Sequence, residues 1–240
     1  YKSSRMFNSI ISDGDSGRVP IDFHAMYKNR TSTTQGLWRL RNNLIAMDPI
    51  DPDYLPEMKK PEPRESWQSS LVISYNFKDN IELRNDYVRF DGGIRFGKIL
   101  EDMDALAGNI MLLHCDNYDK YPKKFVTAGV DRIDMNRRFP MNRNLILEGN
   151  IIYTGKSSAT IELVIFDKDD VSFEVCKANF IMAARDGINN TSIAINPIKL
   201  ETDMDQQKYL KAKFDGERRK ANRMKELTLT KPTFEESEMI

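Results

Sequence analysis

Three long apolar segments separated by very short turns constrain the fold of this chain more than any other feature. They are rich in β-branched and aromatic residues, and only "GKS" and "KDD" interrupt them: "NLILEGNIIYTG" (144–155), "SATIELVIFD" (158–167) and "VSFEVCKANFIMAA" (171–184). Strands this close in sequence pair in antiparallel fashion, since a parallel crossover needs roughly a dozen residues or more. The pattern therefore predicts an antiparallel meander.

Two more segments have strand character, and a helix is expected between them. "SSLVISYNF" (69–77) alternates in polarity, a charged loop follows it, and "KFVTAGVDRID" (124–134) leads into the meander. Over residues 97–114, positions 100° apart gather one apolar face: Ile99, Leu100, Met103, Leu106, Ala107, Ile110 and Met111. One long helix and about five strands predict an α+β protein whose helix covers one sheet face.

The two ends of the chain differ from this middle part. Residues 1–65 are rich in Gly and Pro and are predicted to form an irregular arm, with a short helix over 36–47. The α+β domain is expected over 66–197, and 198–240 as a linker and helical tail. The tail contains the basic run "RRKANRMK", which suggests an anionic partner, but interspersed acidic residues favour a solvated helix.

Composition excludes several classes of function. The 36 basic and 36 acidic residues balance, so nucleic acid is not an expected partner. Cys115 and Cys176 are the only cysteines and form no C-x-x-C, so neither a disulfide framework nor a zinc site is predicted, and a reducing compartment is expected. No apolar run is long enough to cross a membrane. Because the chain begins at Tyr1 rather than Met, we expect a processed or trimmed N-terminus.

The predicted helix contains the carboxylates that are candidates for a general base. Asp102 and Asp104 are predicted to lie on opposite borders of its apolar face, while Glu101 points away. A half-desolvated carboxylate has a raised pKa and suits a general base, although many border carboxylates are simply solvated. His114 falls in the middle of the apolar face, where a packed core histidine is the favoured interpretation.

The stretch before the helix has the spacing of a phosphate-binding P-loop, G-x-x-x-x-G-K, at Gly92, Gly97 and Lys98. The next residue is Ile99 where Mg²⁺ binding needs Ser or Thr, and the preceding "RNDYVRF" is too charged for a buried strand. A P-loop is therefore excluded. Two glycines before a helix still allow a ligand to approach backbone N–H groups that suit a phosphate or an oxyanion.

Four separated motifs now identify a family: "IRFGKILEDMDALAG", "VTAGVDRIDM", "GNIIYTGKSSATIEL" and "ANFIMAARD". In this order they resemble the hotdog-fold acyl-coenzyme A thioesterases, of the mitochondrial two-hotdog type found in animals. The similarity runs from about Pro63 to the C-terminus. It implies a hotdog fold, a long central helix wrapped by a five- to six-stranded antiparallel sheet, and a mitochondrial (matrix) location.

The resemblance also implies an activity and its catalytic residues. The family hydrolyses fatty acyl-coenzyme A to free acid and coenzyme A, at a site between two hotdogs. Asp104 matches the family aspartate that serves as general base or nucleophile, with Asp102 as the second candidate. By analogy with helix-start geometry, the backbone at Gly93 and Ile94 would supply oxyanion donors. The family's partner Asn has no clear match, because Asn85 lies seven residues before Gly92.

Phosphate groups of coenzyme A need donors, and the motif "TGKSS" resembles the family segment that meets the nucleotide. Lys156, Ser157 and Ser158 offer a cation and two hydroxyls, and Arg185 is a weaker candidate. A polar hairpin turn is an equally good interpretation of these residues. Coenzyme A is part of the substrate, so no separate cofactor is expected.

Only one hotdog repeat is found where the family has two. The chain is thus expected to be a fragment of a longer enzyme, or a shortened protein that pairs with itself (as a dimer) or with another subunit. The alternative function is a non-catalytic hotdog subunit with a structural role in a larger mitochondrial assembly. A hotdog hydratase would need a suitably placed His, and neither His24 nor His114 fits. A serine esterase is excluded because the sequence contains no G-x-S-x-G motif, and a metal hydrolase is excluded because the sequence offers no set of metal ligands.

Overall fold

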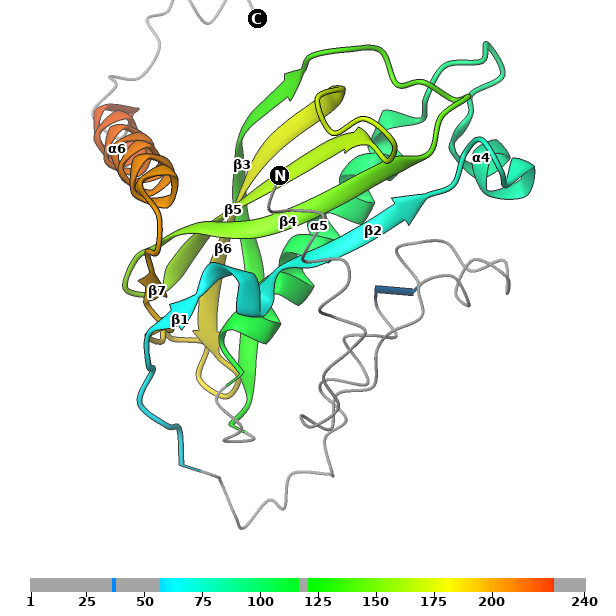
Figure 1. The fold of residues 1–240 in the computed structure, drawn as a ribbon. Coiled ribbons are helices and arrows are strands. Elements are labelled where there is room, and N and C mark those ends of the chain that lie inside the picture. The colour runs from blue at the N-terminus through cyan, green and yellow to red at the C-terminus, as the bar shows by residue number, and fades with distance from the viewer. Residues whose placement is uncertain (1–35, 38–56, 117–120, 227–240) are drawn as a thin grey trace, which may run out of the picture.

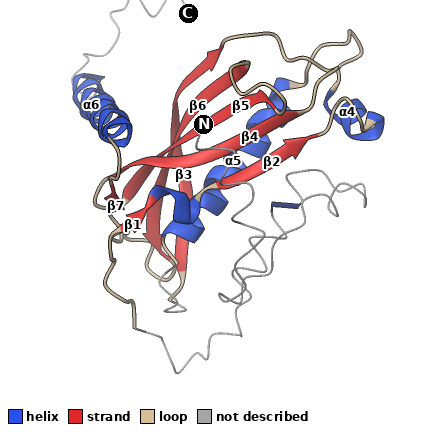
Figure 2. Ribbon diagram, viewed as in Figure 1, coloured by secondary structure: helices blue, strands red, loops and turns tan. Residues whose placement is uncertain are grey.

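A five-stranded antiparallel sheet and a long helix organise the residues that the computed structural model describes, 36–37, 57–116 and 121–226 (Figure 1). The strands lie in the order β2-β4-β5-β6-β3, so that β2 and β3 form the two edges. Their bounds are β2 Leu71–Tyr75, β3 Lys123–Met135, β4 Leu145–Thr154, β5 Ser158–Asp167 and β6 Glu174–Asp186. Figure 2 shows the strands curving around the central helix.

The helices lie on different sides of this sheet. The long helix α5 (Phe96–His114) packs on what we call the inner face, and α6 (Asp203–Glu226) lies on the opposite, outer face (Figure 1). The short helix α4 (Ile81–Tyr87) precedes α5. A 3-10 helix, η1 (Ser66–Ser69), and a small parallel pair, β1 (Arg64–Glu65) with β7 (Ile198–Lys199), complete the described elements.

The predicted α+β hotdog architecture is confirmed. Each predicted strand is present with ends that differ by no more than three residues, and the predicted helix 97–114 is α5. The three long segments joined by short turns are β4, β5 and β6, paired in antiparallel register as the turn lengths require. Among the residues that the structure describes, the sheet has five strands.

The prediction of a charged loop after β2 is wrong in part, because this segment contains α4. The side chain of Asn80 accepts a hydrogen bond from the Leu83 amide at 2.9 Å and caps this helix. Leu83 and Tyr87, one turn apart, are buried. The capping residue and the i, i+4 apolar pair are visible in the sequence, but the charged residues between them obscure the periodicity that would predict a helix.

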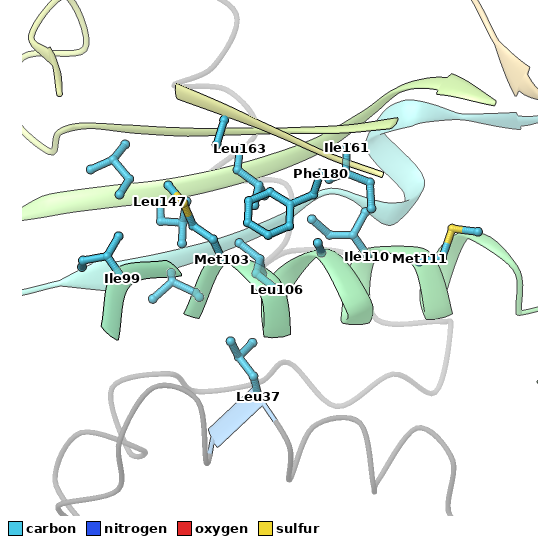
Figure 3. Packing of buried hydrophobic residues seen from close by; sticks show 14 of the residues in the cluster. Leu37, Ile99, Met103, Leu106, Ile110, Met111, Leu147, Ile161, Leu163 and Phe180 are labelled. Carbon is cyan, nitrogen blue, oxygen red and sulfur yellow. The ribbon is translucent and has the colours of Figure 1, made fainter. Parts of the chain in front are cut away.

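Helix α5 is fixed by its apolar stripe. Ile99, Met103, Leu106 and Ile110 are fully buried and face inner-face residues of β4, β5 and β6 (Figure 3). The closest approach is at Gly149 of β4, where a Cβ would lie only 2.6 Å from Leu163 Cδ2 and would also collide with Ile110. The absence of a side chain there lets the helix lie directly on the sheet.

Helix α6 covers the outer face by polar contacts. Glu162 of β5 is buried and accepts hydrogen bonds from Lys177 on β6 (2.5 Å) and from Lys208 on α6 (2.6 Å). Burial raises the pKa of Glu162, but the two lysine hydrogen bonds outweigh this effect and the pKa is lowered. The rings of Tyr153 and Tyr209 pack at 5.0 Å. The tail is thus helical as predicted, but it is docked rather than fully solvated.

The described part of the predicted arm contacts the domain. Arg64 donates to the carbonyl of Leu113 at 2.8 Å, and its amide donates to Pro197 O at 2.8 Å. Leu37 is buried on the side of α5 away from the sheet (Figure 3), and it is one of two described residues of the helix predicted over 36–47. The rest of that helix and residues 1–35 lie outside the described residues.

His114 confirms the prediction of a packed core histidine. It is fully buried, Ser69 Oγ lies 3.2 Å from Nδ1, and Nε2 lies 2.9 Å from the carbonyl oxygen of Asn196. Because Nε2 faces a carbonyl oxygen, Nε2 carries the proton and Nδ1 accepts from the Ser69 hydroxyl. Burial lowers the pKa of His114 to about 4, so the imidazole is neutral at pH 7.

The packing at Gly149 predicts that an alanine there lowers stability more than an alanine at Gly129 does. Gly149→Ala should destabilise the fold by about 1–3 kcal/mol, because the new methyl group overpacks the α5–sheet contact. Gly129→Ala on β3 is the matched control, since a Cβ there meets nothing within 4 Å. Urea unfolding of both variants measures the effect. Equal stabilities would contradict the assignment of Gly149 as the point of closest approach.

His114 predicts that stability falls in mild acid. The unfolded chain binds a proton near pH 6.5 and the folded chain only near pH 4, so the unfolded state binds more protons between these values. The free energy of unfolding should fall as the pH drops from 6.5 to 4, by up to about 3 kcal/mol, and be constant with respect to this group above pH 7. His114→Gln should remove this part of the slope. Urea titrations at several pH values check it, and an unchanged slope in the variant would refute the assignment.

Candidate functional site

Asp104 lies at the junction of α5 with the edge strand β3. Its side chain is exposed, and its Oδ1 accepts a hydrogen bond from the hydroxyl of Thr127 on β3 at 2.5 Å. The Thr127 hydroxyl also lies 3.4 Å from the sulfur of Met182, a buried inner-face residue of β6. One oxygen of Asp104 is therefore held toward the sheet on the side of α5 where the solvent has access.

Asp102 lies in a different environment, and the prediction that it borders the apolar face is wrong. It is fully buried, and its Oδ2 accepts hydrogen bonds from the hydroxyls of Tyr75 (2.9 Å) and Tyr87 (2.6 Å). Two residues along a helix turn by about 200°, so Asp102 faces β2 and α4 when Asp104 faces β3. The two tyrosine hydroxyls supply polar partners that compensate the burial of the carboxyl group.

The glycine stretch before α5 forms a small hairpin. The amide of Arg89 donates to Gly93 O and the amide of Arg95 to Tyr87 O, both at 2.7 Å, and Gly92 takes a φ of 79°, which favours glycine. The amide of Gly93 donates to Oδ1 of Asp91 at 3.1 Å, and this bond lowers the pKa of Asp91. The predicted oxyanion donors, Gly93 and Ile94, thus lie before the first turn of α5, and Gly93 already has an acceptor.

The four candidate phosphate ligands are brought to one end of β5 and β6. Lys156 and Ser157 lie in the turn between β4 and β5, and Ser158 begins β5; here Gly155 N donates to Ser158 O and Ala184 N to Ser157 O. Ser158 pairs with Ala183 on β6, two residues before Arg185.

Two of these candidates, Ser158 and Arg185, lie on the face of the sheet opposite to Asp104. Ala183 and Arg185 alternate with the buried inner-face residues Met182 and Ala184, so they point outward with Ser158. Asp104 is on the inner face with α5. Within a single copy, the structure does not bring the predicted catalytic acid and the predicted phosphate ligands together.

Sequence reasoning missed the surroundings of Asp104 on β3. Thr127 was not singled out, and three apolar residues of the same strand pair with buried inner-face residues yet are themselves 38–49 % exposed: Val130, Ile133 and Met135. Their alternation was visible in the segment 124–134. Their exposure follows from β3 being a sheet edge, which the order of segments along the chain does not reveal.

No family model matches the chain, but its sequence is similar to those of known proteins. It is 33 % identical over 237 residues to an acyl-coenzyme A thioesterase 4, mitochondrial, of Humulus lupulus, covering 94 % of this chain and 44 % of the relative. It is 28 % identical over 210 residues to acyl-coenzyme A thioesterase 9, mitochondrial, of Mus musculus, covering 85 % and 48 %. The chain spans about half the length of the curated relatives it matches.

Solved structures show the fold. An acyl-CoA hydrolase from Staphylococcus aureus superposes with a TM-score of 0.57 at 18 % identity, over 70 % of this chain and 93 % of that one. An acyl-CoA hydrolase from Bacillus cereus superposes with a TM-score of 0.56 at 18 % identity, over 72 % and 100 %. The chain is a hotdog-fold protein. The resemblance of its sequence to the acyl-coenzyme A thioesterases is confirmed by the relatives from Humulus lupulus and Mus musculus.

No metal or membrane feature accompanies the site in the part of the chain that the structure describes. There, no three or more His, Cys, Asp or Glu side chains gather as a metal would need, and each helix is too short or too polar to cross a bilayer.

The different surroundings of the two helix carboxylates predict unequal effects on stability. Asp102→Ala removes the acceptor of two buried tyrosine hydroxyls and should destabilise the fold by about 1–3 kcal/mol. Asp104→Ala, at an exposed position of the same helix, should change stability by less than about 0.5 kcal/mol. Thermal unfolding followed by circular dichroism compares the two variants, and a smaller loss for Asp102→Ala would contradict its structural assignment.

Proposed function

We propose that this chain is the Asp104-bearing hotdog of an acyl-coenzyme A thioesterase. The observation that supports this most directly is the exposed carboxylate of Asp104, oriented by the Thr127 hydroxyl and adjacent to an exposed apolar strip on β3. A thioester substrate needs a carboxylate that can activate water and an apolar surface for its acyl chain. Both occur at one junction of a fold shared with acyl-CoA hydrolases.

The proposed reaction needs only water and the residues of the site. Asp104 accepts a proton from water as the water oxygen attacks the thioester carbonyl, and the carbon–sulfur bond then breaks with the proton passing to the leaving thiolate. The products are a free acid and coenzyme A. A direct attack by the Asp104 carboxylate, followed by hydrolysis of the anhydride, gives the same products. Neither route uses a cofactor.

The apolar strip on β3 gives the acyl chain a place to bind. Val130, Ile133 and Met135 lie on the inner face beyond the cover of α5, with the catalytic candidate Asp104 close by through Thr127. An acyl chain along this strip would present its thioester to Asp104. The strip is open along the sheet edge, so a second hotdog is required to enclose the chain.

A second hotdog is proposed to pair with β3 and complete the site. The strand is 13 residues long, and antiparallel pairing with a second β3 about Gly129 would set Lys124 opposite Asp134, a favourable pair of charges. A solved thioesterase of this fold is hexameric, which is consistent with pairing.

The proposed location is the mitochondrion, and more specifically its matrix. Relatives from hop, mouse, cattle and human have mitochondrial names, whereas one from hop is named chloroplastic. The fold itself carries no information on the compartment.

Removing the carboxylate tests the proposed catalyst. Asp104→Asn should lower kcat/KM for acyl-coenzyme A hydrolysis by about 10²–10⁴-fold without unfolding the protein, the range for loss of a general base. Thr127→Ala should cause a smaller loss, because it only frees the carboxylate. Glu101→Gln, an exposed carboxylate one turn earlier on α5, is the matched control. Release of free thiol over a panel of acyl chain lengths is the measurement.

The same assay separates the two candidate functions. If Asp104→Asn and Glu101→Gln retain equal activity, Asp104 is not the catalyst. If the unaltered chain hydrolyses no acyl-coenzyme A but forms a stoichiometric complex with unrelated proteins, the structural subunit replaces the thioesterase as the function.

A further inference from the structure

The apolar strip on β3 runs from Asp104 toward the beginning of α5. The first residue of β3, Lys123, donates to the carbonyl of Cys115 at 3.2 Å, just past the end of the helix, whereas Thr127 binds Asp104 near the middle of the helix. The strand is therefore antiparallel to α5, and its later residues lie beside the first turns of the helix. The exposed apolar residues of the strip all follow Thr127 along the strand.

The space between α5 and β3 is filled on the other side of Asp104. There Met111 of α5 is fully buried, Phe125 of β3 packs against the core, and Lys123 ties the strand to the end of the helix. An acyl chain whose thioester lies at Asp104 thus finds its exposed apolar surface on β3 in the direction of the end of that strand.

One row of side chains on α5 borders the same strip. Phe96, Leu100 and Asp104 are spaced four residues apart, so they follow one another along one side of the helix. Each step of four residues turns by about 40°. Because Asp104 lies beside the edge strand β3, these turns carry Leu100 and then Phe96 toward the sheet, and both pack partly buried against the core.

An aromatic contact closes the far end of the strip. After β3 the chain turns, with the amide of Asn136 donating to Val175 O at 3.0 Å. Phe139 of the following segment is 9 % exposed and packs on Phe96, with their ring centroids 5.9 Å apart. We call Phe96 and Phe139 the aromatic stop, since two rings in contact form an apolar wall at the end of the strip.

Two distances give the length available between Asp104 and the aromatic stop. On the helix, the eight residues from Phe96 to Asp104 span about 12 Å. On the sheet, the β6 partners of Thr127 and Ile133 are four residues apart, or about 14 Å. A saturated chain with bonds of about 1.5 Å and angles of about 111° advances about 1.25 Å per carbon. The two distances therefore agree on about ten carbons.

We propose that the aromatic stop limits the acyl group to a medium chain of about ten carbons, and that Phe139 sets this length. The inference rests on the proposed function and names the substrate class of the same site. A shorter acyl group buries less apolar surface on the strip. A longer one brings its last carbons against the ring of Phe139 and must leave the strip, so the added carbons gain nothing.

Binding of a series of S-alkyl-coenzyme A thioethers tests the length without any turnover, since these compounds contain no thioester. From butyl to decyl, the dissociation constant should fall about two- to fourfold with each added methylene. From decyl to hexadecyl it should stay level. Isothermal titration calorimetry on the whole chain is the measurement, and a constant that keeps falling through hexadecyl would overturn the proposal.

Removing the ring of Phe139 should extend the accepted chain. In Phe139→Ala the dissociation constants should keep falling beyond decyl, and the ratio of kcat/KM for palmitoyl- over decanoyl-coenzyme A should rise about tenfold or more. Circular dichroism verifies that the variant is folded. A folded Phe139→Ala with an unchanged chain-length profile would show that this ring does not set the length.

A substitution at an exposed position gives a second test that leaves the buried ring in place. Val130 pairs with Phe180, two residues or about 7 Å from the partner of Thr127, so Val130→Trp places an indole across the strip before the aromatic stop. It should lower kcat/KM for decanoyl-coenzyme A about tenfold or more and leave that for butyryl-coenzyme A unchanged. Val126→Trp is the matched control, because Val126 is 44 % and Val130 43 % exposed on opposite faces of one strand. Identical profiles of the two tryptophan variants would overturn the proposal.

The outcomes separate the aromatic stop from catalysis. If the chain releases no thiol but thioether binding levels off at decyl and shifts in Phe139→Ala, the stop stands and the thioesterase does not. If thiol release depends on Asp104 but every variant has the same chain-length profile, the thioesterase stands and the stop is overturned. A chain that binds none of the thioethers overturns both.

Discussion

The contact between the apolar stripe of α5 and the inner face of the sheet is the constraint on which the structure depends. A helix 19 residues long must bury one side, and only a curved sheet without a side chain at Gly149 lets it lie this close. Once its rotation is fixed by the buried stripe, the directions of its polar side chains are fixed as well. Asp102 turns toward two tyrosines and Asp104 turns toward Thr127 for the same geometric reason.

This fixed rotation places two acids of a single helical turn in different surroundings. Asp102 is surrounded by protein and has hydroxyl donors, so its place is in the fold. Asp104 has one oxygen oriented by Thr127 and lies next to an apolar strip, a combination suited to a thioester with a long acyl tail. The phosphate candidate Arg185 lies on the other face of the sheet, so a single copy does not bring it to Asp104.

Much of the fold could be predicted from the sequence because local patterns determine it. The long strands, their antiparallel pairing, α5 and the buried His114 all follow from periodicity and from turn length. The α4 helix was missed because a seven-residue helix with exposed charges has little apolar periodicity, and its capping Asn80 is a weak signal by itself.

The candidate site could be predicted less completely, since its parts come from distant segments. The sequence resemblance singled out Asp104, but the hydrogen bond from Thr127 depends on β3 lying beside α5, 23 residues further along the chain. Asp102 was predicted to border the apolar face because helical spacing alone does not show which side of the helix is covered by other elements. The tyrosines that bury it belong to β2 and α4, and no local rule locates them.

The unequal lengths of the two sheet edges have a consequence for assembly. β3 offers 13 residues for pairing, whereas β2, the opposite edge, has five. An association that consumes the long edge leaves only the short one, which is too small a template for another strand of comparable length. Growth by edge addition therefore terminates after a single step, and the sheet is protected from the open-ended stacking that leads to fibres.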